Sequence, residues 1–180
     1  MMLSRQNTGL MVVDIQGKLA DIVHDSGTLM DQTAKLIQGA KLLRLPILWL
    51  EQTPDKIGST QAQIANLLAS QEPIKKHTFS GAGSAEFIAA VKQTPVKTWL
   101  ICGIETHICV YQTAMQLLDL GYKVEVVVDC VSSRSLFNKE LAISKLLANG
   151  AATSSVEMCL YELVADSNAP EFKDILKLTK

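Results

Sequence analysis

The feature that most constrains the fold is an alternation of short apolar runs with longer amphipathic segments along the 180 residues. The runs at 9–15 and 96–104 are the most strongly apolar. A run that is apolar without alternation is typical of a parallel strand buried on both faces. On this basis the sequence predicts six strands, the third of them peripheral, at 9–15, 47–50, 73–78, 96–104, 122–128 and 151–153.

The segments between these runs have the apolar spacing of helices, and Pro46, Gly121 and Gly150 end three of them. Strands that alternate with helices predict right-handed crossovers and helices on both faces of a sheet. We therefore expect an α/β fold with three α/β/α layers and a mostly parallel, Rossmann-like sheet of six strands. The predicted helices are 28–45, 60–69, 84–92, 106–120, 138–149 and 156–165.

The length and charge of the chain limit its domain count and its partners. At roughly 150 residues per domain, 180 residues predict one domain, 1–180, with a core at about 7–165 and a tail at 166–180. Lys plus Arg is 17 and Asp plus Glu is 18, which gives a formal charge of −1. Nucleic acids and anionic membranes attract strongly basic surfaces, so neither is expected as a partner. We expect a small-molecule substrate and a homo-oligomer, a dimer or larger.

The four cysteines, Cys102, Cys109, Cys130 and Cys159, are irregularly spaced and form no CxxC pair. No secretory signal or run of about 20 apolar residues accompanies them. These features predict reduced thiols and a cytoplasmic location. A structural zinc site is not expected.

Asp14 and Cys109 follow predicted strands, and ligands of open parallel sheets bind beyond the carboxyl ends of strands. Asp14 is a candidate proton acceptor, or else a structural acid that caps a turn. Cys109 would lie in the first turn of a helix, where amide groups and the helix dipole lower the pKa of a thiol. It could instead be a buried filler, and Cys130, which also follows a strand, is a rival nucleophile.

Lys76 is the third candidate, although adjacent lysines such as Lys75 and Lys76 usually lie in solvent. If Lys76 lay in an active site, its charge would neutralise the charge of Asp14 and help to hold Cys109 as a thiolate. His107 is rejected as a partner of Cys109, because side chains two residues apart on a helix point away from each other.

Three segments together resemble the isochorismatase-like superfamily of cysteine hydrolases. Residues 12–16, Val-Val-Asp-Ile-Gln, are similar to its apolar-Asp-apolar-Gln motif, and residues 76–80, Lys-His-Thr-Phe-Ser, to its Lys-x-x-(Tyr/Phe)-Ser segment. Residues 103–110, Gly-Ile-Glu-Thr-His-Ile-Cys-Val, are similar to its cysteine motif. The likeness covers about residues 7–165, and residues 129–134 resemble its metal-free, isochorismatase-domain-containing branch.

The resemblance implies a catalytic triad of Asp14, Lys76 and Cys109. Cys109 would attack an amide-like carbonyl to give a thioester, with Asp14 accepting the thiol proton and Lys76 orienting Asp14. It also implies a cis peptide between Ile104 and Glu105, and an oxyanion hole formed by the backbone amides of Glu105 and Cys109.

Departures from the family pattern narrow the expected chemistry. Residues 51–58 contain no histidine, whereas nicotinamidases of the superfamily bind a metal through Asp-x-His, so no metal or cofactor is expected. Isochorismatases that hydrolyse a vinyl ether usually lack the nucleophilic cysteine, and Cys109 therefore favours a hydrolase of carbon–nitrogen bonds other than peptide bonds. The alternatives are vinyl-ether hydrolysis and a non-catalytic protein that binds a small molecule or a partner.

Four further residues are candidates for contact with the substrate. They are Gln16, Trp49, Gln52 and Phe79. Trp49 and Phe79 could equally be core residues, since large apolar side chains are usually buried. Gln52 follows a predicted strand, which makes it the candidate closest to the expected site.

Overall fold

The computed structural model describes residues 2–180 and centres on a six-stranded sheet in which the paired strands run parallel. The strand order is β3-β2-β1-β4-β5-β6. This sheet confirms the predicted α/β class and strand number. The strands are β1 (Thr8–Val13), β2 (Ile47–Gln52), β3 (Ile74–Lys76), β4 (Thr98–Ile104), β5 (Lys123–Ser132) and β6 (Ala152–Ser154).

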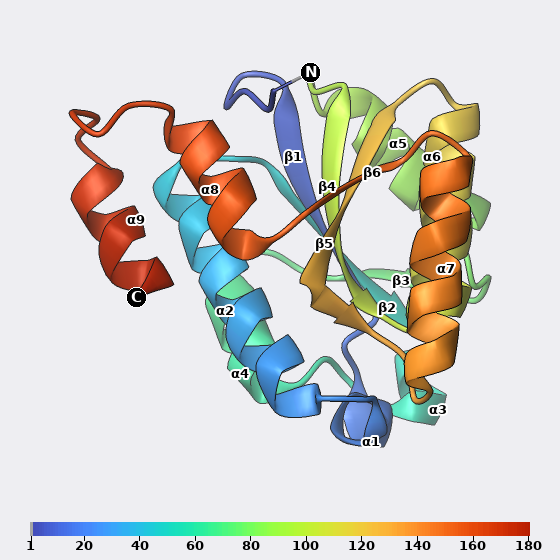
Figure 1. Cartoon of the computed structure of the whole chain (residues 1–180). Helices are drawn as coiled ribbons and strands as arrows, with labels where there is room; N and C mark the ends of the chain where they lie inside the picture. The colour runs from blue at the N-terminus through green and yellow to red at the C-terminus, as the bar shows by residue number, and fades with distance from the viewer. Residues whose placement is uncertain (1) are drawn as a thin grey trace.

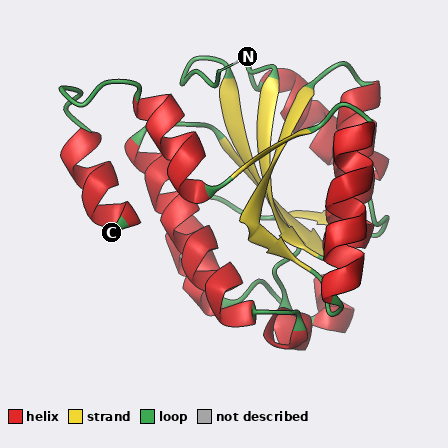
Figure 2. Cartoon of the chain, in the orientation of Figure 1, coloured by secondary structure: helices red, strands yellow, loops and turns green. Residues whose placement is uncertain are grey.

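Helices cover both faces of the sheet and give the expected three layers (Figures 1 and 2). One face carries α2 (Ser26–Leu42), α4 (Ala62–Ala65), α8 (Val156–Val164) and α9 (Phe172–Thr179). The opposite face carries α5 (Ala85–Gln93), α6 (Tyr111–Asp119) and α7 (Leu136–Ala148). Within residues 2–180, none of the helices combines the length and the apolar character needed to cross a bilayer.

The residues of β1 show why its sequence is apolar without alternation. Leu10 and Val12 pack into the apolar cluster that contains α2 and α8. Met11 and Val13 pack into the cluster on the other face of the sheet. All four side chains are fully buried. Each face of a central parallel strand therefore contributes to a separate core.

The structure differs from the sequence prediction along β5, where residues 129–137 were expected to form a loop. The strand continues through Ser132 because its register on β4 shifts, so that Val131 lies opposite Gly103. Polar residues are accommodated in this extension by specific partners. The carboxylate of Asp129, for example, accepts hydrogen bonds from the backbone amide of Val156.

Three helices form where the sequence analysis predicted none. α1 (Gly17–Ile22) and α3 (Pro54–Ile57) are short and lie near the carboxyl ends of the strands, at the bottom of Figure 1. α9 forms in the segment expected to be a tail and packs against α2 and α8. Its Ile175 is completely buried, so this segment contributes to the core.

Gly103 allows β4 to approach β1 closely where both strands end. Its φ is +131°, and it lies opposite Val13 in the sheet. A Cβ atom added at Gly103 would lie 2.0 Å from the carbonyl oxygen of Val13. Only glycine fits this backbone, since other residues rarely adopt such a conformation and rigid main chain occupies the space.

We predict that Gly103→Ala lowers the free energy of unfolding by about 2–3 kcal/mol, because the methyl group collides with backbone that cannot move away. Urea denaturation measures this difference. Gly27→Ala is the matched control, since its methyl group meets no atom within 4 Å and alanine favours helices. Equal stability of the Gly103→Ala variant and the native chain would contradict the prediction.

Candidate active site

Three polar residues from separate parts of the chain meet beyond the carboxyl ends of the strands. Asp14 directly follows β1 and has a left-handed φ of +51°, which aspartate tolerates better than most residues. Lys76 is the last residue of β3. Cys109 lies in a π-helical turn, Thr106–Val110, between β4 and α6. All three side chains are buried.

The lysine is held by four oxygen atoms. Its Nζ donates to Asp14 Oδ2 at 2.6 Å and to Gln52 Oε1 at 2.7 Å. It also lies 3.2 Å from the carbonyl oxygen of Thr78 and 3.0 Å from that of Phe79. A buried charge is tolerated only with such partners, and together they direct the ammonium group toward Asp14.

Cys109 and Asp14 border the same cavity and interact through their side chains. The cavity has a volume of about 190 Å³, below the roughly 300–1,000 Å³ of typical ligand pockets. It can therefore hold only a small part of a substrate. Its wall is completed by the apolar side chains of Leu19, Ile57, Phe79, Ile104 and Ile108, together with Gln52 and Glu105.

Burial raises the pKa of the Cys109 thiol to about 12, and the nearby charge of Asp14 acts in the same direction. Lys76 opposes this shift but does not outweigh it. The expectation of a lowered thiol pKa was therefore wrong, because burial and Asp14 together dominate over the helix start and the lysine. The resting Cys109 side chain is a neutral thiol.

The carboxyl group of Asp14 is suited to accept the thiol proton. Burial raises its pKa, although the charge of Lys76 opposes the shift. Asp14 Oδ2 is bound to Lys76, whereas the buried Oδ1 has no well-formed hydrogen bond to the protein. One oxygen atom thus fixes the carboxylate, and the other is left without a well-formed hydrogen bond.

The remaining cysteines do not border this cavity. Cys102 in β4, Cys130 in β5 and Cys159 in α8 are completely buried in the apolar cluster on the α2 face of the sheet. Burial raises the pKa of each thiol. The interpretation of Cys130 as a rival nucleophile was wrong because β5 continues past it into the core.

Glu105 connects the π-helical turn that contains Cys109 to the loop before α7. The peptide bond between Ile104 and Glu105 is cis. The Glu105 carboxylate accepts from the backbone amide and Nε of Arg134, both at 3.0 Å, and from its Nη2 at 3.2 Å. Burial favours the neutral acid, but these hydrogen bonds and the Arg134 charge hold the pKa of Glu105 below its ordinary value.

Two of the four substrate-contact candidates, Gln52 and Phe79, border the cavity, and two do not. Gln16 is buried, where its side-chain amide bonds the backbone of Gln52 and donates to the carbonyl oxygen of Gly58 at 2.6 Å. The indole of Trp49 donates to Thr60 Oγ1 at 2.9 Å. Gln16 and Trp49 therefore position strand ends and do not contact the cavity.

The sequence analysis missed the contact between Gln52 and Lys76. Gln52 lies opposite Lys76 in the parallel pairing of β2 and β3, and its Nε2 donates to the carbonyl oxygen of His77 at 2.8 Å. This bond turns Oε1 toward the lysine. The carbonyl groups of Thr78 and Phe79 were missed because every residue has one, so they leave no sequence signal.

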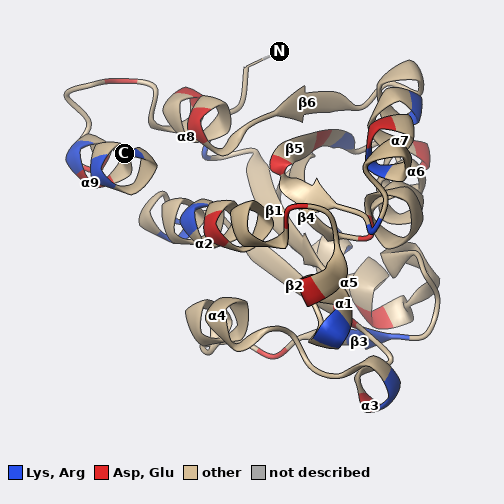
Figure 3. Cartoon of the chain, turned by 60° about the horizontal axis from the view of Figure 1, so that its bottom comes forward, with Lys and Arg blue, Asp and Glu red and all other residues tan. Residues whose placement is uncertain are grey.

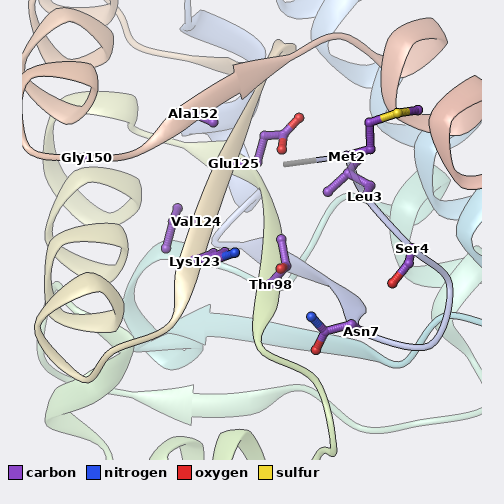
Figure 4. Close-up of a pocket in the computed structure, with 10 residues that line it drawn as sticks. All are labelled: Met2, Leu3, Ser4, Asn7, Thr98, Lys123, Val124, Glu125, Gly150 and Ala152. Atoms are coloured by element: carbon purple, nitrogen blue, oxygen red, sulfur yellow. The ribbon is translucent and has the colours of Figure 1, made fainter.

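A second cavity, of about 280 Å³, lies at the opposite ends of β4 and β5 (Figure 4). It shares no lining residue with the cavity beside Cys109. Glu125 borders it, and burial raises the pKa of this carboxyl group. No cysteine borders it, so the smaller cavity remains the candidate site.

Among residues 2–180, no group of three or more His, Cys, Asp or Glu side chains is placed to hold a metal ion.

The family model for the isochorismatase domain matches residues 8–158. The chain belongs to the isochorismatase family. A secreted isochorismatase effector, Isc1, of Phytophthora sojae is 36% identical over 95% of this chain and 83% of its own length. Isochorismatase domain-containing protein 2 of Bos taurus is 34% identical over 95% of this chain and 82% of its own length. Membership supports a hydrolase of this superfamily.

A solved structure, named MAR1 ribonuclease from Caenorhabditis elegans, superposes with a TM-score of 0.92. It is 33% identical, and the alignment covers 99% of this chain and 92% of that one. The fold of the chain is therefore the isochorismatase-like fold. Asp14, Lys76 and Cys109 all fall inside the region that the family model matches.

We predict that the rate at which iodoacetamide alkylates Cys109 rises about tenfold per pH unit from pH 6 to 10 without a plateau. The reason is that only the thiolate reacts and the thiol pKa is about 12. Peptide-level mass spectrometry measures the rate at Cys109 separately from the other cysteines. A plateau near the ordinary thiol pKa of about 8.5 would contradict the prediction.

We predict that Asp14→Asn makes alkylation of Cys109 faster at neutral pH. The substitution removes the charge that holds the proton on sulfur and leaves Lys76 in place, so the thiol pKa falls. A fall of one pKa unit corresponds to about a tenfold higher rate. Lys76→Met should make alkylation of Cys109 slower, because it removes the charge that lowers the thiol pKa. If both variants changed the alkylation rate in the same direction, the electrostatic argument would be refuted.

Proposed function

We propose that the protein is a cysteine-dependent hydrolase that cleaves a small amide-like substrate through a thioester on Cys109. The observation that carries this proposal is that a thiol and a carboxylate with one unpaired oxygen border one cavity, and that a buried lysine holds this carboxylate. Family membership supports the hydrolase class, and the triad geometry supports the bond type.

In the first step, Cys109 Sγ attacks the carbonyl carbon while its proton passes to Asp14 Oδ1. The carbonyl oxygen becomes an oxyanion, which we assign to the backbone N–H groups of Glu105 and Cys109 because both residues border the cavity. Collapse of this intermediate breaks the carbon–nitrogen bond. The departing nitrogen takes the proton from Asp14, and the acyl group remains on sulfur as a thioester.

In the second step, Asp14 accepts a proton from water, and the resulting hydroxide attacks the thioester carbon. The carbon–sulfur bond breaks, the acid product leaves, and the proton held on Asp14 returns to sulfur. A carboxylate with a raised pKa suits both directions of transfer, because it is a stronger base than ordinary aspartate and still releases the proton. Lys76 keeps Asp14 aligned through its hydrogen bond to Oδ2.

We predict that Cys109→Ala lowers turnover of small amides at least about 10³-fold, because the covalent step is lost. The assay is a panel of small amides and esters, with intact-protein mass spectrometry to detect the acyl adduct. Cys130→Ala is the matched control, because this thiol lies in the core away from the cavity. Turnover that survives in Cys109→Ala would contradict the thioester route.

The same assay separates the alternatives. A vinyl-ether hydrolase would release its product without an acyl adduct on Cys109. A protein that only binds a small molecule would show no turnover difference between the native chain and Cys109→Ala. We favour amide chemistry over both because Cys109 borders the cavity directly beside its proton acceptor.

We also propose a homo-oligomer, a cytoplasmic location and no nucleic-acid partner. Phe137 on α7 is 70% exposed and Leu141 is 47% exposed, which suits contact with another copy. A YcaC structure from Escherichia coli, 20% identical with a TM-score of 0.88, is described as an octameric hydrolase of unknown specificity.

The cytoplasmic proposal rests on the four unpaired cysteines. The Phytophthora relative is by name secreted, and localisation of the tagged full chain would test this point.

The name ribonuclease belongs to the C. elegans structure, and we do not extend it to this chain. The formal charge of −1 supplies no broad basic surface for a polynucleotide. The nearly apolar cavity beside Cys109 is also small for a nucleotide. A small-molecule substrate fits these features better.

A further inference from the structure

The cavity beside Cys109 adjoins a wider groove. This outer groove has a volume of about 800 Å³. Leu19, Ile57 and Glu105 border both spaces. The groove is therefore placed to take the part of a substrate that does not fit the cavity of about 190 Å³ beside Cys109.

The two spaces differ in charge. The inner cavity is lined by apolar side chains, with four exceptions: Asp14, Gln52, Glu105 and Cys109. The outer groove carries Lys18, Lys56 and Arg134 against the single carboxylate of Glu105. Arg134 is paired with Glu105. The ammonium groups of Lys18 and Lys56 make no hydrogen bond or ion pair within the described chain, residues 2–180.

Tight backbone contact between α1 and α3 places both lysines at the same rim. Gly17 has a φ of +48°, and a Cβ atom there would lie 2.0 Å from the carbonyl oxygen of Ile57. The side chain of Gln61 donates to the carbonyl oxygen of Gly17 at 2.8 Å, which further fixes the α1 segment. Figure 3 brings this end of the molecule forward and shows basic positions on both short helices.

Two cations at one rim, neither of them in an ion pair within residues 2–180, favour an anionic ligand. A bound anion would be attracted by both charges. The groove is also open, so the product that leaves first, the amine half of an amide, has a direct route to solvent. The acyl half would stay in the small apolar cavity until the thioester is hydrolysed.

We propose that Lys18 and Lys56 form an anion subsite and that the substrate is an amide of a small apolar acid with an amine that carries a carboxylate. An N-acyl amino acid is the simplest molecule of this class. This inference rests on the proposed function, since the position of the subsite is defined relative to Cys109. The lysines bind the acidic end and take no part in bond cleavage.

The experiment compares two alkylating reagents of equal length, N-iodoacetyl-4-aminobutanoate and its neutral N-methylamide. Each is attacked by Cys109 Sγ at its CH₂ carbon with loss of iodide. In the native protein at low ionic strength, the acidic reagent should alkylate Cys109 about tenfold faster than the neutral one. In the double variant Lys18→Gln/Lys56→Gln this preference should disappear, and salt should weaken it in the native protein.

The matched control is Lys92→Gln/Lys173→Gln, which removes the same charge from exposed positions outside the groove and should keep the preference. Iodoacetamide lacks an acidic tail and should react with Cys109 equally in all three proteins. Equal rates for the two reagents in the native protein, or a preference that survives in the Lys18/Lys56 variant, would overturn the subsite. Neither result would affect the proposed nucleophile.

Calorimetry with N-acetyl-4-aminobutanoate and its N-methylamide tests the subsite without a reactive thiol. The acidic compound should bind more tightly to the native protein and lose this advantage in the Lys18→Gln/Lys56→Gln variant. Suppose that the acidic compound binds more tightly but iodoacetamide fails to label Cys109. This result would overturn the proposed function and leave the subsite standing. No difference in binding between the two compounds would overturn the subsite.

Discussion

The buried ion pair between Lys76 and Asp14 is the interaction on which the site depends. It joins β3 to β1, which are separated by β2 and therefore by two strand spacings, or about 10 Å. Gln52, at the end of β2, bridges this gap by accepting a hydrogen bond from the lysine. Loss of one partner from a buried pair typically costs about 3–5 kcal/mol, so the same contact holds the strand ends and aligns the carboxylate.

This pair also affects the thiol of Cys109. Burial and the charge of Asp14 raise the pKa of the thiol to about 12, and the opposing charge of Lys76, which is bound to Asp14, does not outweigh them. Cys109 therefore rests as a neutral thiol. In the proposed mechanism, proton transfer to Asp14 accompanies attack on the carbonyl group, which is general-base catalysis and not attack by a preformed thiolate.

The proposed substrate selection rests on a change of environment between the cavity and the groove beside it. The walls beside Cys109 are largely apolar, whereas the groove outside carries three basic side chains. Segments that are far apart in the chain create this change, since Lys18 precedes α2 and Lys56 follows β2. Neither the family match nor the fold specifies this rim, because a shared fold supports different substrates.

Residue patterns were enough to predict the α/β class, the six strands and, through the resemblance, the three residues of the candidate triad. Buried parallel strands produce apolar runs that are visible locally, and their ends indicate where a ligand binds. Three other features emerge once the chain is folded: the extension of β5 to Ser132, the contact of Gln52 with Lys76 and the rise in the pKa of the Cys109 thiol. These features depend on strand register, burial and charges brought together from distant segments, and no local pattern of residues encodes such distances.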